Sequence, residues 1–458
     1  MSMYSIGLSG LMANQIAMNV TAQNTANMTV TGYTRKTVEQ ATVVYGGSGN
    51  HGAGDGVTVA SIRRVSDQAA INRLRLAGQE MQYSQTYMVG MQGLENILGM
   101  EGLNISTGFD EFFAALDEST LSPESVVYRN QILSAAKNLA ARFNGSMSQV
   151  ETELSTLMQS QNQSIETLNT QLQNIAKINE QIRAASGQGQ DISSLQDALD
   201  LQLNEISKSV GVSVLTNSDG TVEIATKSGQ PLVSGTNVAQ ISLDSSVGGA
   251  YNTDLLLTFN GQTVSFNNPK GGELGAIEDL ATEQYLPMME DLNNIAAGFA
   301  DAVNALLTGN SATDLNGNPG QALFSYDPNN PASSLTITGI TAEELALSET
   351  GSVGDGGIAL AISDFANQTV TIGGVDTNVY DAYAKIIGYV GAATQQAQNN
   401  YNTASITISE AQSARDSISA VSSDEEAANL LMYMNAYQAN MKVISTASQM
   451  FDTVLNSF

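Results

Sequence analysis

Two stretches of this 458-residue sequence contain residue types that could carry chemistry. The first is DLNGN, from Asp314 to Asn318, which resembles the start of a calcium-binding loop built from side-chain and backbone oxygens. Such a loop also needs a bidentate acid at its twelfth position, and here that position is Ser325. We therefore expect a turn at this point and no bound ion.

The second stretch is GGSGNHGAGDG, which spans 46–56 and contains His51, the single histidine. A catalytic histidine needs an orienting partner and a rigid setting, and a glycine-rich loop supplies neither. The loop also lacks the GKS or GKT ending of a phosphate-binding loop. His51 is expected to be an exposed loop residue.

The rest of the composition narrows the chemistry further. The chain has no cysteine, so disulfides, Cys/His zinc sites and a cysteine nucleophile are excluded. The lone histidine rules out the two-histidine motif of zinc proteases. No spacing among the many Ser, Asp and Glu residues singles out a triad or a carboxylate pair, although folding could still assemble one. We expect a protein that is not an enzyme and that needs no metal and no cofactor.

Charge and hydropathy bear on the partners and on the membrane. Formal net charge is −28, yet residues 1–77 hold six basic and three acidic residues, which leaves about −31 for the remainder. Nucleic acid is a poor partner for such a chain, because phosphate binding needs a dense basic surface. No run of about 18 uncharged apolar residues exists, so no membrane insertion is expected. The first residues have no signal-peptide pattern, so export would require a route without a cleaved signal.

The order of helices and strands follows from proline placement and hydrophobic periodicity. All seven prolines lie between Pro123 and Pro331, which leaves both ends free to form long helices. Apolar periodicity predicts helices over 3–27, 66–99, 122–186, 277–308 and from Ser422 onward, the last with Ser422 and Glu425 as a capping box. Alternating patterns predict a hairpin over 33–65 and a small β-rich unit over 212–268. The predicted fold class is mainly α with β insertions, an α+β multidomain protein.

Both ends show the spacing of a coiled-coil seam, in which apolar residues alternate at intervals of four and three. The N-terminal seam is impure, whereas the C-terminal seam is nearly all apolar, and between Leu430 and the end only Lys442 and Asp452 carry charge. We expect these helices to contact neighbouring subunits, although a buried core helix is the alternative for the C-terminal one. The predicted assembly residues are Leu8, Leu11, Met18, Leu430, Met434, Tyr437, Met441, Ile444, Phe451, Leu455 and Phe458.

The predicted elements group into three domains. A terminal helical domain takes 1–32 plus 424–458. A helical rod domain with the polar hairpin takes 33–210, 276–310 and 357–423. A β-rich outer insert takes 211–275 plus 311–356. The β modules are thus expected to be insertions into an α-helical scaffold whose two arms come from the two chain ends.

Both terminal segments, SIGLSGLMANQIAMNVTAQNTANMTVTGYTRK from Ser5 and SSDEEAANLLMYMNAYQANMKVISTASQMFDTVLN from Ser422, resemble the terminal motifs of the flagellar rod, hook and hook-associated axial proteins. The segments 286–307 and 314–324 are similar to the mid-chain pattern of a hook-associated member. Thr31 stands where the motif often has proline, and 211–275 has no counterpart in the resemblance. The chain is short for this family, which indicates a reduced outer domain near 311–356.

The resemblance implies a structural role. The paired terminal helices would pack around a central export channel, and the protein would join hook to filament at the hook–filament junction. Implied partners are further copies of the chain in a ring or helical assembly, the hook protein, the second junction protein, and an export chaperone on the C-terminal helix. The chain would be cytoplasmic before type III export and extracellular afterwards. The alternatives are another axial protein, such as the hook protein or second junction protein, an enzyme or metalloprotein, and an adhesin whose β insert does the binding.

Overall fold

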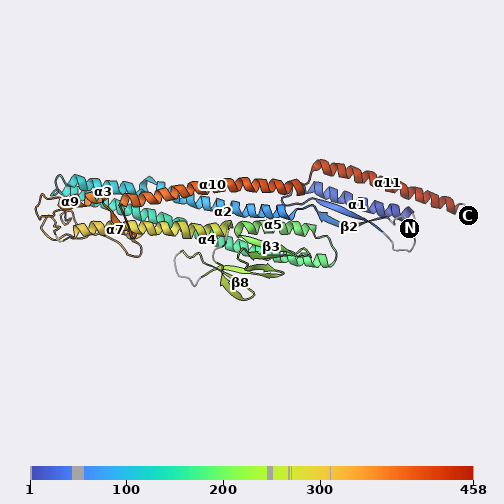
Figure 1. Ribbon diagram of the computed structural model, residues 1–458, viewed down its shortest axis with the longest axis horizontal. Helices are drawn as coiled ribbons and strands as arrows, with labels where there is room; N and C mark the ends of the chain where they lie inside the picture. The colour runs from blue at the N-terminus through green and yellow to red at the C-terminus, as the bar shows by residue number, and fades with distance from the viewer. Residues whose placement is uncertain are drawn as a thin grey trace.

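The protein is an elongated, mainly helical molecule, as seen in a computed structural model that describes residues 3–43, 56–244, 251–266, 269, 271–309 and 311–456. The two terminal helices lie together at one end of the long axis, and small β sheets project from the side of the helical rod (Figure 1). The predicted fold class, mainly α with β insertions, is confirmed.

Long helices form the rod around a first hydrophobic core. They are α2 (Gln68–Gly99), α3 (Ile105–Ser119), α4 (Val126–Gly187), α6 (Gly272–Leu280), α7 (Leu286–Leu307) and α10 (Val379–Ser419), with a π-helical turn at Ala281–Tyr285 joining α6 to α7. Aromatic packing marks the centre of this core, where the rings of Phe109 and Phe299 lie 5.2 Å apart and those of Phe112 and Phe299 lie 5.5 Å apart. The helices predicted over 66–99, 122–186 and 277–308 are confirmed; α3 had no prediction.

A second core lies between the far half of α4, helix α5 (Ser193–Ser209) and two antiparallel sheets. One sheet has the order β3 (Val212–Thr216), β4 (Val222–Thr226), β5 (Pro231–Ser234), β6 (Asn237–Val238), and the other β7 (Gln240–Leu243), β8 (Leu255–Phe259), β9 (Gln262–Ser265). The turn between β8 and β9 places Asn260 at φ 49° and Gly261 at φ 79°, the left-handed backbone that an Asn-Gly hairpin turn requires. The predicted β-rich unit over 212–268 is confirmed where the structure describes it.

Short elements cover the end of the rod away from the termini. They are β10 (Phe324–Ser325), α8 (Pro331–Ser334), β11 (Thr336–Ile337), α9 (Gly357–Asp364), β12 (Val370–Ile372) and β13 (Val375–Thr377), with 3-10 turns at Glu101–Leu103 and Phe365–Asn367. Apolar residues of 311–356, such as Phe324 and Leu335, belong to the first core, whereas the strands of 212–266 belong to the second. The two segments grouped as one outer insert therefore pack on different cores, and the domain division stays a proposal.

The DLNGN segment forms the predicted turn. Asp314 Oδ1 accepts from the backbone N–H groups of Asn316 and Asn318, both at 2.8 Å, and Gly317 has φ 79°. The Asp314 carboxylate thus accepts hydrogen bonds from the backbone of its own loop. His51 and most of its glycine-rich loop lie outside the described residues, so the expectation for it stays a prediction.

Helix α4 runs through both cores. Its 62 residues span roughly 93 Å at about 1.5 Å per residue. Sequence periodicity predicts that one face of this helix packs inward, and eight of its nine residues are buried: Val150, Leu154, Gln161, Ile165, Leu168, Leu172, Ile175 and Ile182. The ninth, Leu157, is partly buried against the first core. One continuous helix therefore carries the helical core and the β-rich core on the same backbone.

Candidate assembly interface

The two chain ends form one antiparallel helix pair. Helix α1 (Met3–Ala26) packs along α11 (Ser423–Leu455), so Gly7 lies near Ile444 while Gly10 lies near Asn440 (Figure 1). Ser422 caps α11 by accepting from the backbone N–H of Glu425 at 3.5 Å, which is the serine half of the predicted capping box. The carboxylate of Glu425 pairs with the guanidinium of Arg35 on the neighbouring hairpin.

Small residues on α1 let the two helices approach closely. The buried stripe of α1 consists of Gly7, Gly10, Ala13, Ala17, Val20, Thr21 and Asn24. A Cβ added to Gly7 would lie 3.0 Å from Ile444 Cγ1, and one added to Gly10 would lie 2.8 Å from Asn440 Nδ2. Both distances are shorter than ordinary van der Waals contact, so a larger side chain at either position would force the facing side chains of α11 to shift.

The structure places most of the predicted seam residues beside this contact, whereas Ile444 lies in it, against Gly7. Leu8, Leu11 and Met18 are half-buried, and so are Tyr437 and Ile444. The other five described seam residues of α11 are exposed: Leu430 43%, Met434 40%, Met441 48%, Phe451 66% and Leu455 61%. Phe458 lies outside the described residues. The contact between the chain's own ends is therefore made on α1 by small side chains rather than by its seam residues, because close packing selects small side chains and the 4-3 pattern selects large ones. The expected contacts of the seam with neighbouring subunits stay a prediction.

A polar hairpin fastens this helix pair to the rod. Strands β1 (Lys36–Thr42) and β2 (Val57–Arg64) pair antiparallel, as predicted. The buried side chain of Asn24 makes the two hydrogen bonds to Lys36 that the backbone of a neighbouring strand could otherwise make. Its Nδ2 donates to Lys36 O at 2.9 Å, and its Oδ1 accepts from Lys36 N at 3.0 Å. The same Oδ1 accepts from the Tyr33 hydroxyl at 2.9 Å. Asn24 thereby connects the end of α1 to the start of the hairpin.

The turn between Asn24 and the hairpin meets the end of α10. Gly32 has φ 83°, a left-handed conformation that glycine adopts without strain. The guanidinium of Arg415 donates to the carbonyls of Gly32 and Tyr33 at 3.3 Å, and the Arg35 N–H donates to Ser419 O at 2.9 Å. Burial, aided by nearby carboxylates, raises the pKa of Tyr33 to about 12. Tyr33 is therefore a neutral hydrogen-bond donor at physiological pH.

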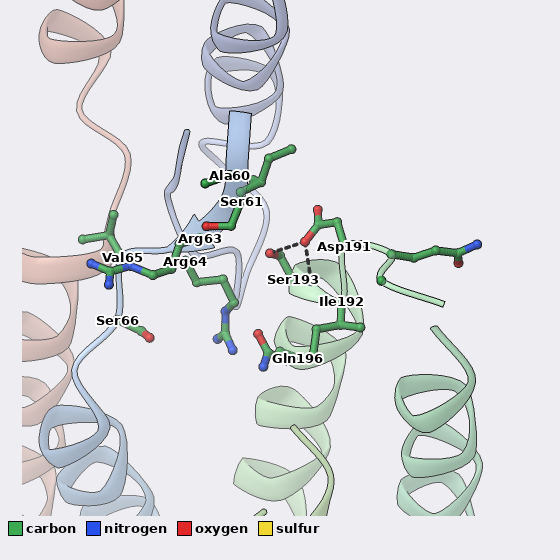
Figure 2. Close-up of a pocket in the computed structure, with 13 residues that line it drawn as sticks. Ala60, Ser61, Arg63, Arg64, Val65, Ser66, Asp191, Ile192, Ser193 and Gln196 are labelled. Atoms are coloured by element: carbon green, nitrogen blue, oxygen red, sulfur yellow. Dashed lines mark hydrogen bonds between the residues drawn. The ribbon is translucent and has the colours of Figure 1, made fainter. Parts of the chain in front are cut away.

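An ionic cluster joins the hairpin to α5. Arg64 Nε lies 2.8 Å from Asp197 Oδ1, and Arg64 Nη2 lies 2.5 Å from Asp200 Oδ2. Lys36 Nζ donates to Ser194 Oγ at 2.9 Å. A cavity of about 690 Å³ separates β2 from the start of α5, and Figure 2 shows Arg64 and Gln196 on its two sides.

Two observations on the described residues concern metal binding and membrane spanning. No group of three or more His, Cys, Asp or Glu side chains among them is placed to hold a metal ion. None of the described helices combines the length and apolarity that crossing a bilayer requires.

Known protein-family models match three parts of this chain. The model of the flagellar hook-associated protein FlgK helical domain matches residues 91–324, about half of the chain. This chain belongs to the flagellar hook-associated protein FlgK family. Models of a flagellar basal body rod protein and of the FlgEFG C-terminal region match 5–34 and 412–457. The FlgK match extends over 211–275, which the sequence resemblance left without a counterpart.

Relatives of the FlgK family cover nearly the whole chain. Flagellar hook-associated protein 1 of Bacillus subtilis is 25% identical over 97% of this chain and 96% of its own, and that of Salmonella typhimurium is 24% identical over 99% of both. The second alignment has 555 positions against 458 residues here, so that relative contains residues that this chain lacks. The flagellar hook junction protein FlgK of Burkholderia pseudomallei has the same fold, with TM-score 0.69, 15% identity, and coverage of 76% of this chain and 100% of that one. These relatives are structural proteins of the flagellum, which supports a non-enzymatic role.

Sequence reasoning missed several residues that build this part of the FlgK-family fold. Gly7, Gly10 and Asn24 all lie within the N-terminal motif, but their roles depend on α11 and on the hairpin, which local periodicity does not reveal. A usable signal was present: a glycine pair spaced by three within a predicted helix is costly for helix formation and so indicates close packing.

Proposed function

We propose that this chain is a structural adaptor of the bacterial flagellum that joins hook to filament by assembling around the axial export channel. The observation that carries the proposal is the apolar surface that the α1–α11 pair leaves open. Large apolar side chains that are at least one-third exposed lie on both helices: Met3, Tyr4, Ile6, Met12, Ile16, Leu430, Leu431, Met432, Met434, Met441, Met450, Phe451, Val454 and Leu455. Such a concentration is typical of a protein–protein interface.

The distribution of side chains around α11 supports a place in the wall of a tube. At 3.6 residues per turn, the positions that flank the α1 contact are apolar on both sides. One flank holds Leu430, Met434, Met441 and Leu455, and the other holds Met432, Met450 and Val454. A helix with one partner in its own chain and an apolar flank on either side is suited to contact two neighbouring subunits.

The side of α11 opposite α1 is polar and nearly uncharged. It carries Asn435, Gln438, Lys442, Thr446, Gln449 and Thr453, all exposed, and Leu431 interrupts it near the start. A surface of amides and hydroxyls suits the lining of a channel through which unfolded chains pass, because it offers neither a strong charge nor an apolar surface to bind them. We call this side of α11 the polar ridge and propose that it faces the export channel.

The predicted partners and domains complete the proposal. Copies of this chain contact each other through the seam residues of both terminal helices, and the hook protein and the second junction protein contact the two ends of the resulting ring. Before type III export, a cytoplasmic chaperone holds α11. The rod forms the tube wall, and the β-rich unit lies toward the outside, with the outer region near 311–356 reduced. Outside the cell, the protein stays at the hook–filament junction.

Substitutions on α11 test the assembly surface. Met441→Asp or Phe451→Asp places a charge on an apolar flank or at the apolar tip of the helix pair, and burying an unpaired charge at an interface is strongly unfavourable. We expect loss of incorporation and of swimming, with the rod still folded by circular dichroism. Thr453→Asp is the matched control, because it adds the same charge on the ridge and should still assemble. Normal swimming of both Asp variants at 441 and 451 would contradict the proposal.

Deletion of the gene tests the place in the flagellum. Electron microscopy should find hooks without filaments, together with filament subunits shed into the medium. Cells without hooks would instead indicate another axial protein. Removal of residues 423–458 should block both chaperone binding and filament growth; an unchanged chaperone affinity would place the chaperone elsewhere.

A further inference from the structure

The terminal module, defined here as α1, the β1–β2 hairpin and α11, shares no hydrophobic core with the rod. Both clusters of buried apolar residues begin after the hairpin and end before α11, the first spanning Met91 to Ala397 and the second Ile165 to Leu274. Within the described residues, the module therefore relies on something other than apolar burial to hold its orientation.

Ion pairs and hydrogen bonds hold the terminal module on the rod instead. Arg64 contacts Asp197 and Asp200 of α5, Lys36 contacts Ser194, and Arg415 of α10 donates to two carbonyls of the turn before β1. We call this contact between the terminal module and the rod the joint. Its charged and polar groups are strongly hydrated when the module and the rod are apart. Closing the joint exchanges protein–water hydrogen bonds for protein–protein ones, and the net gain in stability from such an exchange is small.

The ionic cluster is also imperfectly satisfied. Arg64 Nε and Asp197 Oδ1 lie 2.8 Å apart, yet neither atom completes a well-aligned hydrogen bond within the described structure. Arg75 is buried beside Asp200 at 3.9 Å, and its Nε and Nη2 likewise have no hydrogen-bond partner there. Burial raises the pKa of Asp197 despite the neighbouring Arg64, so desolvation outweighs the attraction at this carboxylate. Buried ion pairs with such geometry contribute little net stability.

Cavities lie on both sides of α5 at this joint. The cavity of about 690 Å³ between β2 and the α4–α5 loop (Figure 2) is matched by one of about 410 Å³ between the end of α1 and α5. The second is lined by residues such as Asn27, Val30 and Leu201. Space on either side of a polar contact lets the hairpin tilt without first displacing packed side chains.

The chain crosses the joint in two short extended segments. One joins β2 to α2, where Asp67 has φ −113° and ψ 114°. The other joins α10 to α11, where Ala420 has ψ 155° and Ser422 has ψ 121°. No helix continues through either crossing, so a change in a few backbone angles can reorient the whole module.

We propose that the contact of Arg64 with Asp197 and Asp200 is an ionic latch, and that the terminal module tilts on the rod when the latch opens. In the closed state the module has the orientation seen here. In the open state the three charged groups are hydrated, the hairpin separates from α5, and the two extended crossings act as the hinge. The latch permits one subunit to fit neighbours that present different packing angles.

Distance measurements between two spin labels test the latch in the full chain. The chain has no cysteine, so cysteines introduced at the exposed positions Thr42 on β1 and Lys177 on α4 are the sole attachment points. At about 0.01 M NaCl we expect a single narrow distance distribution. Asp197→Asn combined with Asp200→Asn should add a second population at longer distance. Glu205→Gln is the matched control, because it removes the ion pair with Lys208 on the same helix without touching the hairpin.

A second measurement requires no change at the latch. Raising NaCl from about 0.01 M to about 1 M shortens the Debye length from about 30 Å to about 3 Å, so the longer-distance population should also grow in the labelled wild-type chain. Two results would overturn the proposal: a distribution that is already broad at low salt, or one that stays narrow in the Asp197/Asp200 double variant.

Discussion

Replacing Asn24 with alanine should detach the hairpin from α1. The Asn24 side chain is 1% exposed and makes three hydrogen bonds, two with the backbone of Lys36 and one with the Tyr33 hydroxyl. Asn24→Ala leaves each of those partner groups without its bond, at a cost of about 1 kcal/mol or more apiece. The expected loss is about 3 kcal/mol for the terminal module alone, because the module shares no core with the rod.

Amide hydrogen exchange measures this loss segment by segment. Since about 1.4 kcal/mol corresponds to a tenfold change in an equilibrium, exchange over 3–43 and 423–456 should accelerate roughly 100-fold. Exchange in α4 should be unchanged. Asn27→Ala is the matched control, because its amide makes one exposed bond to Gln23 O and should cost less than about 0.5 kcal/mol. Equal effects of the two substitutions, or equal acceleration in the rod, would refute the reasoning.

Three further predictions concern the helical scaffold and its end cover. The Asp355 carboxylate accepts from several backbone N–H groups, which hold its pKa well below the ordinary value. The ionised carboxylate therefore adds to the free energy of unfolding above pH about 4, and this contribution is lost as the pH falls further. Urea unfolding followed against pH should show this loss in the wild-type chain and not in Asp355→Asn. Arg129 is buried and donates to three backbone carbonyls, so Arg129→Met should lower the free energy of unfolding by about 2 kcal/mol or more, and an unchanged urea midpoint would contradict this. Leu172→Ala should cost about 2–5 kcal/mol in the second core by the same assay, and Leu201→Ala, at a position that is 38% exposed, far less.

The long elements could be predicted because their signals are local. Helix α4 shows its apolar face at regular spacing over many turns, and the Asn260–Gly261 turn between two alternating stretches specifies a hairpin. The hairpin of β12 and β13 escaped prediction because strands of three residues carry too little periodicity. Helix α3 had no prediction although its signal is local, since its buried residues Ile105, Phe109, Phe112 and Leu116 recur at helical spacing. In the fold, α3 packs on α4 and α9, and β12 packs on α7.

The terminal helices show what periodicity reveals and what it leaves out. A 4-3 pattern finds the largest side chains of α11, such as Met434 and Met441, and these remain exposed within the chain. The contact between the chain's own ends is made on α1 by glycine and alanine, which no hydrophobic pattern would select. The ionic contact of Arg64 with α5 is equally invisible in the sequence, because its members lie more than 130 residues apart.

Helix α4 also has a mechanical consequence. Because one unbroken helix belongs to both cores, a twisting force applied to the β-rich unit reaches the far end of the rod through continuous backbone rather than through a linker. The joint to the terminal module has no such continuity. In a rotating assembly, stiffness would thus reside in the rod, whereas compliance would be concentrated in the few polar contacts beside α5, and strain between neighbouring subunits would relax there first.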